Sequence, residues 1–335
     1  MNKNHKSLID FVKNSVKDCH VLVVGDVMLD KYFYGEVTRI SPEAPVPITR
    51  VTRVKETLGG AANVAHNLSR MGANTSIAGF IGTDYHGDSL MEQFRLRGID
   101  TKNIIEASVP TTTKLRVIGG HQQMMRLDFE DTTALDDGAM EKLIKSVKAE
   151  LKQHSENTAV ILSDYGKGVC TAENCAAIID AAHESGIPVI IDPKGRDWER
   201  YSEADYITPN LKELNEVQKT PAANTDDEVA HAARYAMRKY HIHGMVATRS
   251  ECGLTLVRSH VKNAVHIPTK AQEVFDVSGA GDTVIAIFAL AIAGSIAPRD
   301  AAYLANLAAG VVVAHLGTYA ISNDELLSAL EQEQE

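Results

Sequence analysis

Short runs of valine, isoleucine and leucine alternate with longer helical stretches over most of this chain. The runs lack the apolar–polar alternation of a strand with one exposed face, so both faces of each strand should be buried. Strands of that kind, separated by amphipathic helices, form a mostly parallel sheet with helices on both faces. We expect strands at 21–24, 75–80, 159–162, 189–191, 206–208 and 245–248, and helices at 60–71, 140–152, 171–185, 225–239, 280–293 and 299–316.

Two stretches depart from this alternation of apolar strands and helices. Residues 32–58 are rich in β-branched residues and proline and have no helical period. Residues 111–128 alternate apolar with polar side chains, which is the period of a strand with one exposed face. We therefore predict one α/β domain over 1–335, with segments at about 31–58 and 108–130 inserted in it as a small β lid.

The composition excludes several classes of protein. With 335 residues, 44% of them hydrophobic, the chain can bury a large core. A net charge of −10 argues against a partner such as nucleic acid or a membrane surface, although a few local cations could still hold an anionic substrate. The four cysteines are scattered without a CxxC pair, and no apolar run is long enough to span a membrane. We expect a soluble cytoplasmic protein with reduced thiols, and no metal site built from its dispersed histidines.

The most informative segment runs from a predicted strand through Ser-Gly-Ala-Gly-Asp-Thr directly into the apolar helix at 280–293. A helix N-terminus aims free backbone N–H groups and the positive end of the helix dipole at one point. Gly279, Ala280 and Gly281 are small enough for a phosphate to approach that backbone closely. The segment therefore predicts an anion site.

Asp282 stands where that anion should bind, and its charge would repel a phosphate. A carboxylate belongs there if it takes the proton from a hydroxyl group that attacks the phosphate. The alternative is that Asp282 caps the helix, because aspartate is common in a first turn. The chain has no GxxxxGK[ST] loop, and Val284 occupies the place of the last glycine of a dinucleotide-binding GxGxxG motif.

Two further segments are candidates for ligand contact. Gly59 and Gly60, followed by Asn63 at the start of a helix, suit a close approach to a polyhydroxylated ligand, or else tight packing of a helix on the sheet. Asp26 and Asp30 follow the first predicted strand, and open α/β sheets bind ligands at the carboxyl ends of their strands. An aspartate there could equally form a turn.

Taken together, these segments resemble the ribokinase-like (PfkB) carbohydrate kinases over nearly the whole chain. The Gly-Gly-x-x-Asn and Asp-x-x-Gly-Ala-Gly-Asp segments look like the two signatures of that family. The branch that the chain resembles is the D-glycero-β-D-manno-heptose-7-phosphate kinases of lipopolysaccharide core biosynthesis. The matching segments are Asp26-Val-Met-Leu-Asp-Lys-Tyr-Phe-Tyr-Gly35, Arg39-Ile-Ser-Pro-Glu-Ala-Pro-Val-Pro47, Leu162-Ser-Asp-Tyr-Gly-Lys-Gly168 and Pro268-Thr-Lys-Ala-Gln-Glu-Val-Phe-Asp-Val-Ser-Gly-Ala-Gly-Asp-Thr283.

The resemblance implies a three-layer α/β/α sandwich with a mostly parallel central sheet and a small β lid, and an ATP- and Mg²⁺-dependent kinase. It implies that Asp282 is the catalytic base above an anion hole, and that Glu213 lies by the magnesium ion. For Asn210 and Glu213 the alternative is a helix N-cap with a first-turn acid. The remaining implied positions are Gly279, Ala280 and Gly281 in the anion hole; Asp30, Gly59, Gly60 and Asn63 at the sugar; Asn210, Leu211, Lys212, Thr248, Ser250, Gly253 and Asn306 at the nucleotide; and Asp276 and Gly317 near a monovalent cation such as K⁺.

A sugar that already carries a phosphate needs cations away from the reacting hydroxyl. Lys114 and Arg116 would share one face of a lid strand, with Arg126 nearby and Lys194 as another candidate. The alternative is an ordinary solvated lid face. The chain departs from this branch at Gly120-His121, where heptose kinases usually have Arg-Asn. Two alternatives therefore stay open: a kinase for another sugar, and a catalytically silent sensor of a sugar or nucleotide.

Two expectations concern assembly and extent. Many relatives continue into a nucleotidyltransferase domain with an HxGH motif that this sequence lacks, which leads us to expect the kinase alone. The apolar lid residues Val46, Ile48, Val51 and Val54 suggest a homodimer through the lid.

Overall fold

The computed structural model describes residues 3–120, 122–131, 135, 137–154, 156–270 and 274–333. Its main body is a nine-stranded sheet in the order β13-β12-β11-β10-β9-β8-β1-β4-β5. The strands from β10 to β5 run parallel, whereas β12 is antiparallel to both of its neighbours. The bounds are β1 His20–Gly25, β4 Asn74–Gly82, β5 Asp100–Ala107, β8 Thr158–Ser163, β9 Val189–Asp192, β10 Tyr206–Ile207, β11 Gly244–Thr248, β12 Leu254–Arg258 and β13 Val265–Ile267.

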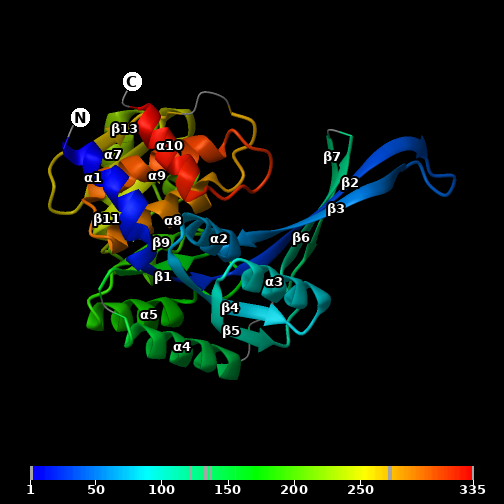
Figure 1. The fold of residues 1–335 in the computed structure, drawn as a ribbon, viewed down its shortest axis with the longest axis horizontal. Helices are drawn as coiled ribbons and strands as arrows, with labels where there is room; N and C mark the ends of the chain where they lie inside the picture. Colours follow the sequence, from blue (N-terminus) through cyan, green and yellow to red (C-terminus); the bar gives the residue numbers. More distant parts are fainter. Residues whose placement is uncertain are drawn as a thin grey trace.

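Helices cover both faces of this sheet, as the uninterrupted apolar strands predict (Figure 1). In β1, Val21 and Val23 belong to one apolar cluster, whereas Leu22 and Val24 belong to a second cluster on the opposite face. The three-layer sandwich is therefore confirmed. The first cluster includes α1 Lys3–Asp10, α2 Ala61–Met71, α3 Tyr85–Leu96, α8 Ala280–Ala293, α9 Pro298–Val312 and α10 Asn323–Gln332; the second includes α4 Asp137–Leu151, α5 Ala172–Glu184, α6 Leu211–Glu216 and α7 Asp226–Lys239.

Most predicted elements are found within one to three residues of their expected bounds. The expected helix at 299–316 is too long, because α9 already ends at Val312 and the chain turns toward Gly317, whose φ is +76°. The strands β12 and β13 were not expected, since they form an antiparallel edge rather than continuing the strand–helix alternation.

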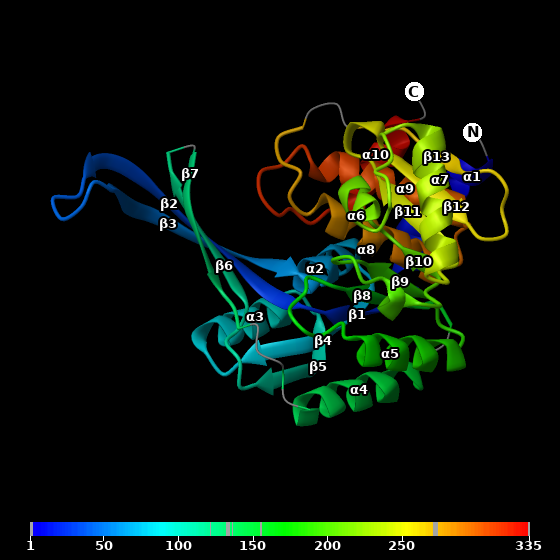
Figure 2. The same ribbon diagram turned by 180° about the vertical axis from the view of Figure 1, so that it is seen from behind.

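The lid is a separate four-stranded sheet in the order β3-β2-β6-β7. It extends away from the main body as a long twisted ribbon (Figures 1 and 2). The first lid segment starts earlier than expected, because β2 leaves the core directly after β1 and its residue Leu29 is still fully buried. The strands are β2 Val27–Ile40, β3 Pro47–Gly60, β6 Thr113–Gly119 and β7 Gln122–Phe129.

Within the described ranges, no helix combines the length and the apolarity needed to cross a membrane.

Candidate active site

The N-terminus of α8 lies where the lid meets the carboxyl ends of the central strands. Gly279 has a φ of +83°, and a side chain there would approach the Asn63 amide to 3.0 Å. The next glycine, Gly281, is exposed and faces open space. Among the described residues, the N–H groups of Gly281 and Asp282 have no acceptor. These two N–H groups are therefore available to an anion, and the anion site stays a prediction.

Asp282 lies in the first turn of α8 with only 6% of its surface exposed. Its carboxylate does not cap the helix. Asn63 Nδ2 donates to one oxygen at 2.6 Å, and the Tyr165 hydroxyl donates to the other at 2.5 Å. Burial raises the pKa of Asp282 to about 6, although these two hydrogen bonds oppose the rise. A carboxylate with that pKa can exist in either protonation state near neutral pH, as a general base requires.

Tyr165 was not identified as a site residue from the sequence, although it lies within the quoted segment 162–168. Its position depends on Asp26, whose buried carboxylate accepts hydrogen bonds from the backbone N–H groups of Tyr165, Lys167 and Val169. Asp26 therefore acts as the turn former that the sequence left as an alternative. It shapes the loop that brings the Tyr165 hydroxyl to Asp282.

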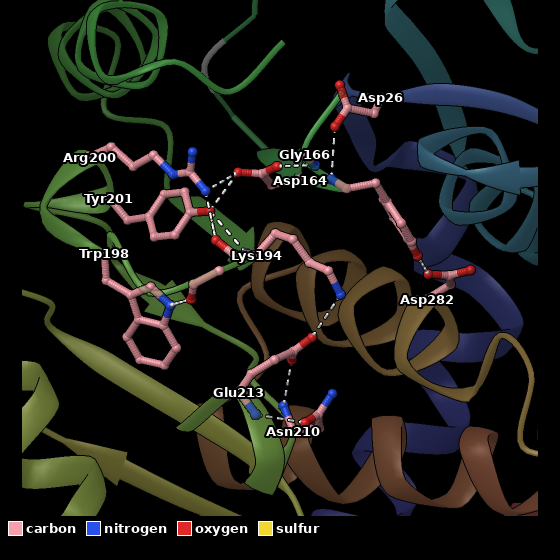
Figure 3. A network of polar contacts seen from close by, with 12 residues as sticks. Asp26, Asp164, Gly166, Lys194, Trp198, Arg200, Tyr201, Asn210, Glu213 and Asp282 are labelled. Atoms are coloured by element: carbon pink, nitrogen blue, oxygen red, sulfur yellow. Dashed lines mark hydrogen bonds and ion pairs between the residues drawn. The ribbon is translucent and has the colours of Figure 1, made fainter. Parts of the chain in front are cut away.

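A second network of polar side chains holds this loop against the next one. The Arg200 guanidinium lies 2.9 Å from the Asp164 carboxylate and donates to the Lys194 carbonyl oxygen at 2.6 Å. The Tyr201 hydroxyl donates to Asp164 at 2.6 Å. Figure 3 shows Arg200 and Tyr201 converging on Asp164, with Lys194 extending toward Glu213. The loops after β8 and β9 are therefore fixed to each other.

The lid closes one side of the site with charged groups. Asp30 in β2 accepts a hydrogen bond from the Arg116 guanidinium at 2.6 Å. A side chain at Gly59 would lie 2.7 Å from the Asp30 carboxylate, so glycine is required there. Gly60 has a φ of +54° and precedes α2, which carries Asn63 to Asp282. The four residues expected at the sugar thus lie close to the candidate base.

Three of the four predicted phosphate-binding cations share one face of the lid. Lys114 and Arg116 lie two residues apart in β6, and Arg126 in β7 pairs directly with Arg116. Burial lowers the pKa of Lys114, and the Lys114 ammonium group lies 5.4 Å from the centre of the Tyr165 ring. Arg126 is already held by Asp128 through two hydrogen bonds of 2.7 and 2.5 Å.

Lys194 does not join this lid group. It follows β9, and its ammonium group lies 3.6 Å from the Glu213 carboxylate. Asn210 and Glu213 form a reciprocal capping box at the start of α6. The helix N-cap that the sequence left as an alternative for these two residues is therefore observed. Leu211 and Lys212 are the two residues between them. Lys194 therefore lies beside the predicted nucleotide segment rather than beside the lid cations.

Asp192, at the end of β9, is an acid that sequence analysis did not single out. Burial, together with the charges of Asp282 and Glu213, raises the pKa of Asp192 well above its usual value. Carboxylates crowded in this way repel one another, and a divalent cation with oxygen ligands would relieve the repulsion. Asp192 and Glu213 are thus candidate oxygen ligands for a magnesium ion.

The other predicted nucleotide residues border the same edge of the sheet. Thr248, at the end of β11, forms an isolated bridge with Asn210. Ser250 and Gly253 have φ values of +52° and +77°, and a side chain at Gly253 would meet a carbonyl oxygen at 2.1 Å. Asn306 in α9 is buried and donates its amide to the Pro268 carbonyl at 2.8 Å. Asn306 thus holds the loop beside it.

The two residues predicted near a monovalent cation lie within the described residues, whereas part of the segment that departs from the heptose kinases does not. Asp276 accepts backbone hydrogen bonds from Gly317 and Ser278, each at 2.9 Å, so the two predicted residues are in contact. His121 lies outside the described residues, as do residues 271–273 of the quoted C-terminal segment.

One group of side chains that the sequence did not suggest lies at the other end of β1. Potential metal-ligand atoms of His20, Glu150 and His154 lie within 4.8 Å of one another. However, the two imidazole rings are stacked 4.1 Å apart, so a metal ion could not lie in both ring planes, and the Lys102 ammonium is 3.5 Å from Glu150. We interpret the group as a buried charge network.

Comparisons with known proteins agree with this geometry. The model of the pfkB family carbohydrate kinases matches residues 19–325. The bifunctional protein HldE of Magnetococcus marinus is 46% identical over 325 residues, which are 96% of this chain and 66% of that protein, so the chain spans slightly less than two thirds of its length.

Two solved structures share the fold at lower identity. Phosphofructokinase-2 from Escherichia coli in complex with potassium has a TM-score of 0.76 at 18% identity, covering 95% of this chain and 99% of that one. Arabidopsis thaliana ribokinase complexed with ribose and ATP has a TM-score of 0.72 at 19% identity, covering 93% and 99%.

Proposed function

The chain belongs to the pfkB family of carbohydrate kinases, and we propose that it phosphorylates D-glycero-β-D-manno-heptose 7-phosphate at O1, with ATP as the donor. The family makes it a phosphotransferase that acts on a sugar hydroxyl group. We further propose that residues 1–335 form a single kinase domain. Because ATP is the donor, the proposal implies a cytoplasmic reaction.

The observation that carries the chemistry is the buried Asp282 carboxylate beside an open helix N-terminus. A carboxylate offers about four lone-pair positions, and Asn63 and Tyr165 use only one on each oxygen. The attacking hydroxyl can therefore donate to Asp282, which takes the proton as the oxygen attacks the terminal phosphate. The free N–H groups at Gly281 and Asp282 then stabilise charge on the transferred group.

Magnesium would bind beside the nucleotide segment. Asp192 and Glu213 would hold it, directly or through water, as oxygen ligands. When bound, it neutralises phosphate charge and orients the donor. Lys194, 3.6 Å from Glu213, is suited to the phosphates of the nucleotide. This assignment differs from its predicted place at the sugar phosphate.

The charges of the lid favour a sugar substrate that already carries a phosphate. Lys114 and Arg116 lie beside two acids that partly neutralise them, Asp30 in β2 and Asp128 in β7, and Arg126 lies next to Arg116 in the sheet. Arginine offers two parallel N–H donors to a phosphate, and the half-buried Lys114 adds a charge that is poorly screened. The resemblance of the lid and loop segments to the heptose kinases then favours the seven-carbon substrate.

The experiment is magnesium-ATP turnover against D-glycero-D-manno-heptose 7-phosphate, sedoheptulose 7-phosphate and fructose 6-phosphate. Asp282→Asn should lower turnover at least about a hundredfold. The matched control, Asp227→Asn in the exposed first turn of α7, should leave it unchanged. Preference for another sugar would keep the mechanism and overturn the substrate. ATP binding without turnover of any sugar would favour the silent sensor instead.

We also propose that two copies pair through the lid. Phe33, Val54, Val117 and Met125 form one cross-strand row on the face opposite Asp30 and Arg116. Val54 and Met125 are 51% and 55% exposed, which is costly on a sheet that protrudes from the body. Sedimentation should show a dimer that Val54→Asp dissociates, and a monomer of the unchanged protein would refute the pairing.

A further inference from the structure

A surface cavity of about 700 Å³ lies between the C-terminal end of α7 and the turn that joins β12 to β13. It opens at the start of β11, whereas Thr248, beside the nucleotide segment, stands at the other end of that strand. The two ends of this five-residue strand are four steps apart, which is about 13 Å. The cavity is therefore distinct from the candidate active site.

The lining of this cavity is strongly basic. Four cationic side chains line it together with one acid, Glu203, and the cations are Arg234, Arg238, Arg258 and Lys262. Histidines also line the cavity. Glu203 is itself paired with His243 at 3.3 Å. None of the four cations forms an ion pair with another described residue. In a chain whose net charge is −10, such a concentration of positive charge is unusual.

Local structure explains only part of this charge. Arg238 lies in the last turn of α7, where a cation complements the helix dipole. Arg234 donates to the Lys262 carbonyl oxygen at 2.8 Å and so ties the β12–β13 turn to α7. Neither reason applies to the charges of Arg258 and Lys262. These two charges repel each other, and no acid among the described residues pairs with either of them.

The backbone of the cavity also stores strain. Glu203 and His241 both line it, and both are non-glycine residues with positive φ values of +69° and +54°. The N–H group of Glu203 donates to the His241 carbonyl oxygen at 2.9 Å, which holds the two strained residues together. Strained residues of this kind persist where the surrounding structure imposes them, and they gather at ligand sites.

We propose that this cavity is a second anion site, which binds a small molecule carrying two or more phosphate groups. Its volume and concave form suit a small ligand rather than the extended backbone of a nucleic acid. Arginines that approach from α7 and from β12 can each bind a separate phosphate through paired N–H donors. The partly exposed Val261 in the lining supplies an apolar contact for the remainder of the molecule.

The test uses inorganic tripolyphosphate as the probe, with calorimetric titration of the full chain in the absence of magnesium. The cavity variant is Arg238→Glu with Arg258→Glu. The control is Lys145→Glu with Lys148→Glu on exposed positions of α4, which changes the net charge by the same amount. Should the cavity variant fail to fold, Arg258→Gln with Lys262→Gln tests the same site with a smaller charge change.

The unchanged protein should show a saturable site whose affinity falls at least tenfold in the cavity variant and less than twofold in the control. Orthophosphate should bind far more weakly than tripolyphosphate, and the KM for ATP should be the same in all three proteins. Equal affinity in the cavity variant would assign the probe to the active site and overturn the proposal. So would an equal loss in the control, because binding would then follow net charge alone.

Discussion

The hydrogen bond between Tyr165 and Asp282 should set the pH dependence of the reaction. The Tyr165 hydroxyl donates to Asp282 at 2.5 Å and so favours its ionised form. A hydrogen bond to a charged group contributes about 1.5–3 kcal/mol. At 1.36 kcal/mol for each pKa unit, Tyr165→Phe should raise the pKa of Asp282 by about one to two units from its value of about 6.

The assay is the pH profile of kcat/KM for the sugar phosphate, which reports groups of the free enzyme and free substrate. A base works only when ionised, so activity falls as pH drops through the pKa of Asp282. The substrate phosphate also titrates near pH 6, but its contribution is the same for both enzymes and cancels in the ratio of the two profiles.

Tyr303→Phe is the matched control, because the Tyr303 hydroxyl donates to Glu333, the exposed residue that directly follows α10. It should leave the acid limb where it is. If the Tyr165→Phe profile had the same acid limb as the unchanged enzyme, then either Asp282 would not be the titrating base or the hydrogen bond would not tune it. Either conclusion would refute the reasoning.

Three other predictions test the lid, a buried charge and the backbone. Arg116→Gln should raise the KM for the sugar phosphate at least about tenfold, the cost of one lost charged hydrogen bond, and leave the KM for ATP unchanged in steady-state kinetics. Burial opposes ionisation of Glu150, but hydrogen bonds outweigh the effect of burial and lower the pKa of Glu150 to about 2. The stabilisation of the fold by the ionised carboxylate is therefore present above about pH 4.5 and is lost as pH falls toward 2. Glu150→Gln should therefore lower the free energy of unfolding at pH 7 by on the order of 3 kcal/mol, with the difference disappearing at low pH in urea titrations; a constant difference would contradict it. Gly253→Ala should lower the melting temperature far more than Gly98→Ala, because both have positive φ but only at Gly253 would the methyl group strike backbone, at 2.1 Å from the Ile267 oxygen.

The fold could be predicted from the sequence because the patterns that indicate it involve residues close together along the chain. Uninterrupted apolar runs indicate strands buried on both faces, and a helix that is apolar all round, such as α8, indicates a buried helix. The small residues before Asp282 predict an anion site for the same reason, since a helix N-terminus and its neighbours are adjacent in the chain. The candidate base and its glycines therefore needed no tertiary information.

Other features depend on the order of the strands. Tyr165 reaches Asp282 across 117 positions because β8 lies near α8 in the folded chain, and the sequence of its loop contains nothing that announces this contact. Asp26 could be assigned as a turn former only when its three backbone partners were visible. Lys194 was predicted as a candidate for the phosphate of the sugar, but its ammonium group lies beside Glu213, after β9.

The division between the two kinds of information has a physical cause. The sequence by itself determined the periodicity of each element, the candidate anion-binding turn and the family, because each of these depends on residues that are neighbours along the chain. Only the tertiary structure decided which carboxylates are crowded, which hydroxyl reaches the base and which cations gather in the cavity beside α7. Burial and charge act through space, and the sheet order sets those distances.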